Sequence, residues 1–278
     1  MMRIALISDI HGNTIALDAV LADCAQLDVN TFWFLGDYAA IGPEPAAVIE
    51  RVVPLPNARF IRGNTDRYVT TGDGPPPTLA DARANPDLID TRTGIAASLA
   101  WTRGFITATG WFDWLADLPL DIRFTAPNGT RILAVHAAPG MDDGEGIHAG
   151  RSNVEIAGLV EGCDADVVFV AHTHEAMARQ VGNTLVVNIG SLSNPRGVDL
   201  RASYVVLEIT TTDVRVTHRR VSYDHELFAE IVQRSRHPAA PFILRHQRGE
   251  NRGRAPHADH TPVTPGETIR VGQSAISR

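Results

Sequence analysis

The segment Arg3-Ile4-Ala5-Leu6-Ile7-Ser8-Asp9-Ile10-His11 decides the fold, because a short apolar run ends directly at an acidic residue and a histidine. Continuous apolar runs of this length fit strands that are buried on both faces, as in parallel sheets. Apolar residues with helical spacing follow from Asn13 onward. This pattern of strand, polar loop and helix predicts an α/β fold.

The same arrangement recurs along the chain. Apolar runs over residues 3–8, 31–35, 59–62, 132–135 and 167–171 precede Asp9-Ile10-His11, Gly36-Asp37, Gly63-Asn64-Thr65-Asp66, His136 and His172-Thr173-His174. In an open α/β sheet, ligands bind in the crevice beyond the carboxyl ends of the strands. We therefore expect five strand ends to deliver these side chains into one crevice.

The side chains at these strand ends are of metal-binding types. Mixtures of imidazole and carboxylate suit first-row transition metals, whereas calcium and magnesium sites are built mostly from oxygen. Each motif alone also has a structural explanation: Asp9 as a helix cap, Asn64 as a turn residue, and the histidines as ordinary polar side chains. The order of all five motifs is what favours a metal site.

As an ordered set, D-x-H, G-D, G-N-x-D, H and H-x-H resembles the calcineurin-like metallophosphoesterases, particularly their compact bacterial members, over roughly residues 3–220. The resemblance implies a four-layer α-β-β-α sandwich of two mixed sheets, with a dinuclear metal site at the carboxyl ends of the strands. It assigns one cation to Asp9, His11, Asp37 and His174. It assigns the second to Asp37, Asn64, His136 and His172, so that Asp37 bridges the pair.

This resemblance implies a hydrolase for phosphate mono- or diesters that uses a water or hydroxide bridging the two cations, with Asp37, Asn64 and His136 at the reacting centre. Metals lower the pKa of bound water from about 15.7 toward roughly 7. Manganese is our first candidate, followed by iron, zinc, nickel or magnesium. The alternative is a scaffold of the same fold that binds partners without turnover.

One position departs from the family pattern. Many members carry a histidine after Gly-Asn that is thought to protonate the leaving oxygen, and here that position is Thr65. General acid catalysis contributes about 10²–10⁴-fold to a rate. We expect either that Asp66, His148 or a water replaces it, or that the enzyme prefers acidic leaving groups such as aryl esters and some diesters.

Other polar residues are candidates for supporting the ligands or meeting substrate. Asp66 and Arg67 follow Thr65 and favour a supporting role. The segment Asn188-Ile189-Gly190-Ser191 resembles the family's Asn-Pro-Gly-Ser loop beside the metals, but it also fits a tight turn at Gly190. Ser191 is thus a candidate for contacting a metal-bound histidine or substrate, and Arg196 for meeting a phosphate.

Composition limits the function classes. The net charge of −7 disfavours general nucleic-acid binding, since nucleic acids are polyanions. Two cysteines suggest no disulfide framework. Neither a signal peptide nor an apolar stretch long enough to span a bilayer is evident. We expect a cytoplasmic protein with a small phosphorylated substrate. Its oligomeric state is open and includes a homodimer.

We expect residues 1–247 to form the phosphoesterase domain and residues 248–278, rich in Arg, Gly, Pro and His, to form a flexible tail. Residues 67–117 form a predicted insertion near the site, with helices over 86–103 and 107–117. In it, residues 72–85 are a candidate lid, and three tryptophans are expected to pack the helices on the sheet. Residues 202–209 and 214–219 are expected to pair and complete the second sheet. Ser222 is expected to cap a following amphipathic helix.

Overall fold

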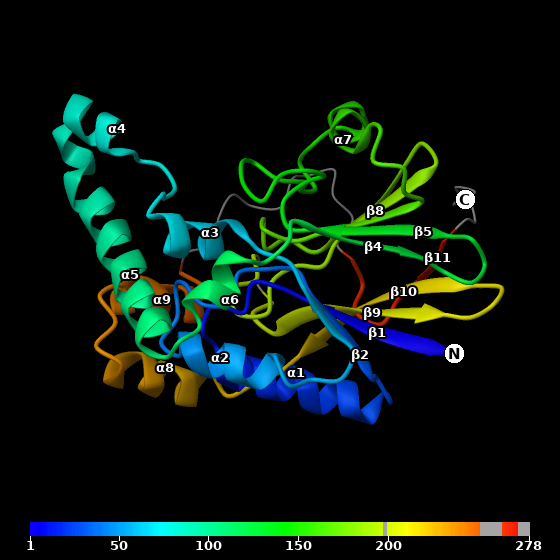
Figure 1. Ribbon diagram of the computed structural model, residues 1–278, viewed down its shortest axis with the longest axis horizontal. Coiled ribbons are helices and arrows are strands. Elements are labelled where there is room, and N and C mark those ends of the chain that lie inside the picture. Colours follow the sequence, from blue (N-terminus) through cyan, green and yellow to red (C-terminus); the bar gives the residue numbers. More distant parts are fainter. Residues whose placement is uncertain (197–198, 251–262, 272–278) are drawn as a thin grey trace.

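Two β-sheets pack face to face and carry helices on their outer faces (Figure 1). The computed structural model describes residues 1–196, 199–250 and 263–271. The first sheet has the order β11-β10-β9-β1-β2-β3, formed by β1 (Met2–Ile7), β2 (Thr31–Phe34), β3 (Ala58–Phe60), β9 (Ala202–Ile209), β10 (Val214–Val221) and β11 (Thr268–Arg270). The second sheet has the order β4-β5-β6-β8-β7, formed by β4 (Asp121–Thr125), β5 (Arg131–Val135), β6 (Val167–Val170), β7 (Met177–Val181) and β8 (Thr184–Asn188).

The alternation of buried residues along β1 explains the layers. Ile4 and Leu6 join the core between the two sheets, whereas Ala5 and Ile7 face the core under the helices. On the outer side of the first sheet lie α1 (Thr14–Gln26) and α2 (Pro45–Val52), and α7 (Asn153–Val160) covers the second sheet. The predicted four-layer α-β-β-α sandwich of two mixed sheets is confirmed.

Strand direction brings the polar loops together. β1, β2 and β3 run parallel in the first sheet, and β5, β6 and β8 run parallel in the second. The carboxyl ends of parallel strands lie on the same side of a sheet, so the polar loops that follow them lie together there in each sheet.

Several expected details differ. The expected pair of strands forms, as β9 and β10, but it joins the first sheet, because β9 pairs antiparallel with β1 and covers what would otherwise be an exposed edge. The amphipathic helix is α8 (His225–Arg234), and its cap is Asp224, which accepts from the Leu227 N–H, rather than Ser222. A second short helix follows, α9 (Ala240–Gln247).

The insertion contains more helices than expected. After α3 (Asn64–Thr71) come α4 (Leu79–Ala84), the short 3₁₀ helix η1 (Pro86–Leu88), α5 (Ile89–Ala108) and α6 (Phe112–Ala116). The helix predicted over 107–117 is interrupted by Gly110, whose φ of 79° ends α5. Figure 1 shows α4 and the start of α5 at the outer end of the molecule.

The tryptophans of the insertion divide between two roles. Trp114 packs edge-on against Tyr38 and Phe60, and Trp111 packs against Trp114, as expected for helices packed on the sheet. Trp101 instead packs edge-on against His237, with ring centroids 4.5 Å apart. It therefore ties α5 to the segment between α8 and α9.

The predicted flexible tail is wrong for one segment. Thr268–Arg270 forms β11, which pairs antiparallel with Arg215–Thr217 of β10, so backbone pairing orders a segment with few large apolar residues. The rest of the predicted tail beyond Glu250 lies largely outside the described residues. In the described ranges, no helix has the length and apolar character needed to cross a membrane.

Candidate metal centre

All seven predicted ligands lie just beyond the carboxyl ends of strands. Asp9 and His11 follow β1, Asp37 follows β2, and Asn64 follows β3 at the start of α3, while His136 follows β5 and His172 and His174 follow β6. Five of these side chains are almost completely buried, and the two late histidines are partly buried.

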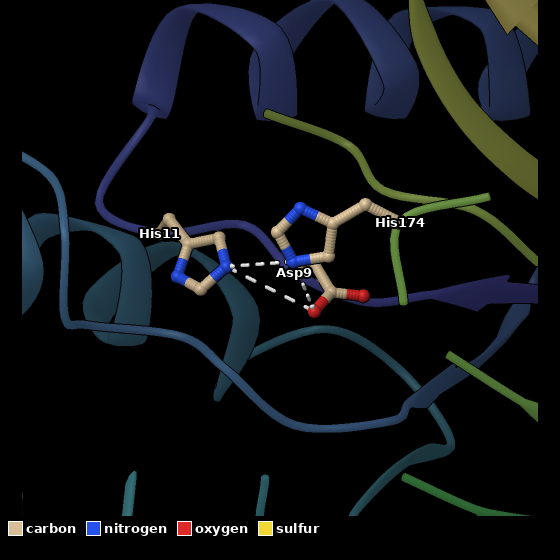
Figure 2. Close-up of side chains that lie close together, drawn as sticks. All are labelled: Asp9, His11 and His174. Carbon is tan, nitrogen blue, oxygen red and sulfur yellow. Dashed lines mark hydrogen bonds and ion pairs between the residues drawn. The ribbon is translucent and has the colours of Figure 1, made fainter. Parts of the chain in front are cut away.

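One group consists of Asp9, His11 and His174 (Figure 2). Their ligand atoms lie within 4.8 Å of one another. His174 Nε2 is 3.1 Å from Asp9 Oδ1 and 3.4 Å from His11 Nε2, and His11 Nε2 is 3.8 Å from the same Asp9 oxygen. Figure 2 shows the two imidazole rings pointing toward the carboxylate from different loops.

A second group is centred on Asn64. Its Oδ1 lies 3.1 Å from His136 Nε2 and 3.0 Å from His172 Nδ1. Asp37 stands between the two groups, because its Oδ2 is 3.8 Å from His11 Nε2 and 3.6 Å from His136 Nε2. Ligand atoms of Asp9, Asp37 and His136 also lie within 4.8 Å of one another, so Asp9 belongs to both groups by distance. The division of the seven residues between two cations stays a prediction.

Backbone carbonyls fix which ring nitrogen faces the centre. Nδ1 donates to Ala40 O in His11, to Leu35 O in His136 and to Asn194 O in His174, whereas in His172 it is Nε2 that donates to Gly144 O. These hydrogen bonds assign the tautomers, since one nitrogen must carry the proton that it donates. When such a ring is neutral, its other nitrogen is an unprotonated acceptor, as a metal ligand requires.

These acceptor atoms lie close together, with no hydrogen-bond donor of the described residues between them. If both rings are neutral with the proton on Nδ1, the lone pairs of His11 Nε2 and His174 Nε2 face each other at 3.4 Å. Both oxygens of Asp9 are buried and receive no hydrogen bond of good geometry, although His174 Nε2 is near. Buried acceptors of this kind are costly unless they are paired or coordinate a cation. The donor set therefore fits divalent cations.

The backbone at these positions is unusual. Five candidate ligands have positive φ angles although none is glycine: Asp9 (53°), His11 (48°), Asp37 (58°), His172 (64°) and His174 (60°). Non-glycine residues enter this region uncommonly, and such strain clusters at functional sites. Neighbouring glycines allow the close loop packing, since a Cβ on Gly63 would lie 2.1 Å from Asp37 Oδ1.

The pKa values of the buried acids and histidines depend on burial and on the charges of their neighbours. Burial raises the pKa of Asp9, but attraction to His174, His136 and His11 outweighs it and holds the pKa below its usual range. Burial lowers the pKa of His136, yet Asp37 and Asp9 raise it overall. For His11, burial prevails and the pKa is lowered.

Asp66 supports the Asp37 loop instead of facing the centre. Its carboxylate accepts from the N–H groups of Asp37 at 2.7 Å, Gly63 at 2.8 Å and Tyr38 at 3.1 Å. Burial and repulsion from Asp37 raise the pKa of Asp66 to about 7, against these hydrogen bonds. Asp66 thus shapes the loop that holds Asp37.

Arg67 and Tyr68 order the loop that positions His172. Arg67 donates to Asp142 and Asp143, and the Tyr68 hydroxyl donates to Asp143. The neighbouring Gly144 provides the carbonyl that accepts from His172. Sequence reasoning missed Tyr68 and this carbonyl. The signal was present as acidic and glycine residues at 142–146, shortly after His136.

The Asn188–Ser191 segment supports the site from behind. Asn188 donates to Ile147 O, Ala171 O and Thr173 Oγ1, which braces the segment that carries His172 and His174. Ser191 donates to Asp9 O. Gly190 has a φ of 76°, which fits the expected tight turn. The contact of Ser191 with a metal-bound histidine or substrate stays a prediction.

Of the remaining candidates, Thr65 is the one that lines the cavity over the ligands. The backbone N–H of Arg196 donates to His174 O, while its side chain is exposed. His148 accepts from the Gly150 N–H through Nδ1, and in the described chain it is not part of that cavity's lining.

Comparisons with known proteins agree with this geometry. Residues 2–212 match the model of the calcineurin-like phosphoesterase superfamily domain. An uncharacterized protein, MJ0912, of Methanocaldococcus jannaschii is 27% identical over 252 residues, which cover 84% of this chain and 93% of that protein. Two crystal structures share the fold. The hypothetical protein PH1004 from Pyrococcus horikoshii OT3 has a TM-score of 0.73, is 22% identical, and is matched over 88% of this chain and 98% of its own. A metallophosphoesterase from Sphaerobacter thermophilus has a TM-score of 0.68, is 24% identical, and is matched over 90% of this chain and 99% of its own.

Proposed function

This chain belongs to the calcineurin-like phosphoesterase superfamily, and we propose from this that it holds two divalent cations and hydrolyses phosphate mono- or diesters of small molecules. Manganese is the first candidate for both cations. In the reaction, water adds to phosphorus, the ester P–O bond breaks, and the organic group leaves as an alcohol.

The observation that carries the proposal is the convergence of carboxylate, amide and imidazole ligand atoms on two neighbouring points. One set comprises Asp9, His11 and His174, and the other comprises Asn64, His136 and His172. Asp37 Oδ2 lies within 4 Å of an imidazole from each set and is suited to bridge them. Paired divalent cations supply Lewis acidity, which lowers the pKa of coordinated water and offsets phosphoryl charge.

The chain's own residues hold this arrangement and orient the ester. Backbone carbonyls keep each imidazole in the tautomer that faces the centre. Thr65 at the cavity floor is a poor proton donor, so the leaving oxygen must obtain its proton from water or leave as a weakly basic anion. We therefore propose a preference for esters with acidic leaving groups.

The test measures metal content together with hydrolysis of p-nitrophenyl phosphate and bis(p-nitrophenyl) phosphate. Wild type is compared with His172→Asn, which keeps a residue type that tolerates positive φ, and with His225→Asn as a control outside the cavity. We expect wild type and His225→Asn to bind about two cations per chain and to hydrolyse at least one ester, with a loss of about 100-fold or more in His172→Asn.

Two results would contradict the proposal. Full metal content without hydrolysis of either ester would favour a silent binding scaffold. Unchanged turnover in His172→Asn would place the chemistry elsewhere in the molecule.

A further inference from the structure

A cavity of about 640 Å³ opens directly over the candidate metal centre. Its floor includes His11, Asp37, Asn64, His172 and His174. Small-molecule sites usually have volumes of about 300–1,000 Å³. The cavity therefore has room for a phosphate at the floor and an organic group above it.

The walls of this cavity are largely apolar. Carbon-rich side chains come from separate parts of the chain: Ile41, Ile95, Leu99, Pro238, Pro241 and Phe242. The charged residues in the lining outside the floor are Asp90 on α5 and Arg245 on α9, one of each sign. A bound group above the floor would thus meet mainly hydrocarbon and little net charge.

One wall is a single face of α5. Thr91, Gly94, Ile95, Ser98 and Leu99 all line the cavity, and their spacing of three and four residues places them on one side of the helix. The predicted lid over residues 72–85 contributes Pro75, so α5 takes most of the role expected of that segment.

The opposite wall lies outside the matched family domain. Pro238, Pro241, Phe242 and Arg245 follow residue 212, where the family match ends. This wall is fixed to the rest of the molecule, because Trp101 of α5 packs on His237 and Gln247 donates to Ser193 O beside the metal centre. The apolar cavity is consequently preformed, and one of its walls lies beyond the residues that match the family model.

A further polar atom is available at the cavity floor. The Thr65 side chain is 7% exposed and lines the cavity, and its buried Oγ1 has no hydrogen-bond partner among the described residues. A buried hydroxyl without a partner costs free energy unless a ligand satisfies it. Its position at the floor suits the ester oxygen, which is the polar atom next to an apolar organic group.

We propose that this cavity selects phosphate esters whose organic group is uncharged and largely apolar, such as aryl or arylmethyl groups. The inference rests on the proposed phosphoesterase function and deepens it by naming the substrate class. The organic group lies between α5 and the 238–245 segment, and polar esters of sugars or glycerol lose the contact with both walls.

The test compares benzyl phosphate with glycerol 3-phosphate, since both release a primary alcohol. The probe variant is Gly94→Leu, because a Cβ at Gly94 meets no atom within 4 Å and the added side chain has room to extend into the cavity. The matched control is Gly104→Leu, which lies on the same helix, has equally open space at its Cβ and does not line the cavity.

We expect wild type and Gly104→Leu to cleave benzyl phosphate with a kcat/KM about 10–100-fold above that for glycerol 3-phosphate. Gly94→Leu should lose most of this preference, because its side chain would occupy the space proposed for the benzyl group. Equal kcat/KM for the two esters in wild type, or equal losses in both leucine variants, would overturn the inference.

Binding separates this inference from the proposed function. If the metal-loaded protein cleaves neither ester, hydrolysis of the two p-nitrophenyl esters decides about the hydrolase proposal, and affinities for benzylphosphonate and methylphosphonate decide about the cavity. Tighter binding of benzylphosphonate that is lost in Gly94→Leu but kept in Gly104→Leu would support the apolar site. Equal affinities of the two phosphonates would refute it.

Discussion

Asp9 Oδ1 lies 3.1 Å from His174 Nε2, although the two residues follow strands of different sheets. The contact joins loops at the carboxyl ends of the strands in the first sheet to loops at the carboxyl ends of the strands in the second. When the imidazole is neutral, with its proton on Nδ1, Nε2 and the Asp9 oxygens are all acceptors, so the two groups repel unless a cation or proton lies between them.

Metal should therefore stabilise the fold. At a Mn²⁺ concentration about 100 times the dissociation constant, binding adds about 2.7 kcal/mol. For a domain of this size, that corresponds to a rise in Tm of about 5–10 °C. Differential scanning calorimetry with and without a chelator measures it. Asp9→Asn should lose most of the shift, whereas Asp117→Asn at the exposed end of α6 should keep it; an equal shift in both would contradict the site.

Thr65→His should supply the missing proton donor. Esters with basic leaving groups should gain about 10-fold or more in kcat, whereas p-nitrophenyl phosphate should change little, because general acids act mainly on poor leaving groups. The dependence of log kcat on leaving-group pKa measures the change. Thr65→Val, which keeps the shape and removes the hydroxyl, is the control, and an identical dependence in Thr65→His and wild type would argue against this role.

Asp66→Asn should destabilise the Asp37 loop. The new amide N–H points at one or more of the backbone N–H groups that the carboxylate accepts from, those of Asp37, Tyr38 and Gly63. Loss of buried hydrogen bonds of this kind costs about 1–3 kcal/mol each. Urea unfolding in the presence of chelator checks the prediction free of metal effects. An unfolding free energy equal to that of wild type would show that the network contributes little.

His218 should make the fold acid-sensitive. Burial lowers its pKa to about 4, and Nε2 donates to Asn188 O. The unfolded chain, with an ordinary pKa of about 6.5, binds a proton first as the pH falls, so stability is complete above pH 6.5 and is lost toward pH 4. Between pH 7 and 4.5 this amounts to about 2–3 kcal/mol. His218→Gln should reduce the loss in urea unfolding; an unchanged difference between the two pH values would count against it.

The strand ends and the polar residues beyond them were predictable because they depend on local sequence. Each apolar run ends in the sequence at a polar residue just beyond a strand, so Asp9, Asp37 and His136 mark strand termini directly, although their side chains are buried. The position of the β9–β10 pair was not predictable in the same way. It depends on which sheet offers an unpaired edge, and β1 offers it to β9.

The contacts that hold the candidate ligands in place join segments far apart in the sequence, and for that reason they were not predicted. Gly144 O fixes the His172 ring, and Leu35 O fixes the His136 ring, but a carbonyl has no identity in the sequence. The wall formed by Phe242 and its neighbours arises because Trp101 meets His237 across the molecule. The spacing of apolar residues indicates that such helices are amphipathic. It does not indicate which part of the molecule their apolar faces cover.

The left-handed backbone of Asp9, His11, Asp37, His172 and His174 changes how mutagenesis of this protein must be designed. Alanine at any of these positions would remove a ligand atom and would also disfavour the loop conformation. An alanine scan would therefore overstate the contribution of the ligand atoms to metal binding. Asparagine tolerates such torsions better than other replacements, because its short polar side chain bonds locally. Comparing alanine and asparagine variants at each position would therefore distinguish the effect of the loop conformation from the effect of the ligand atoms.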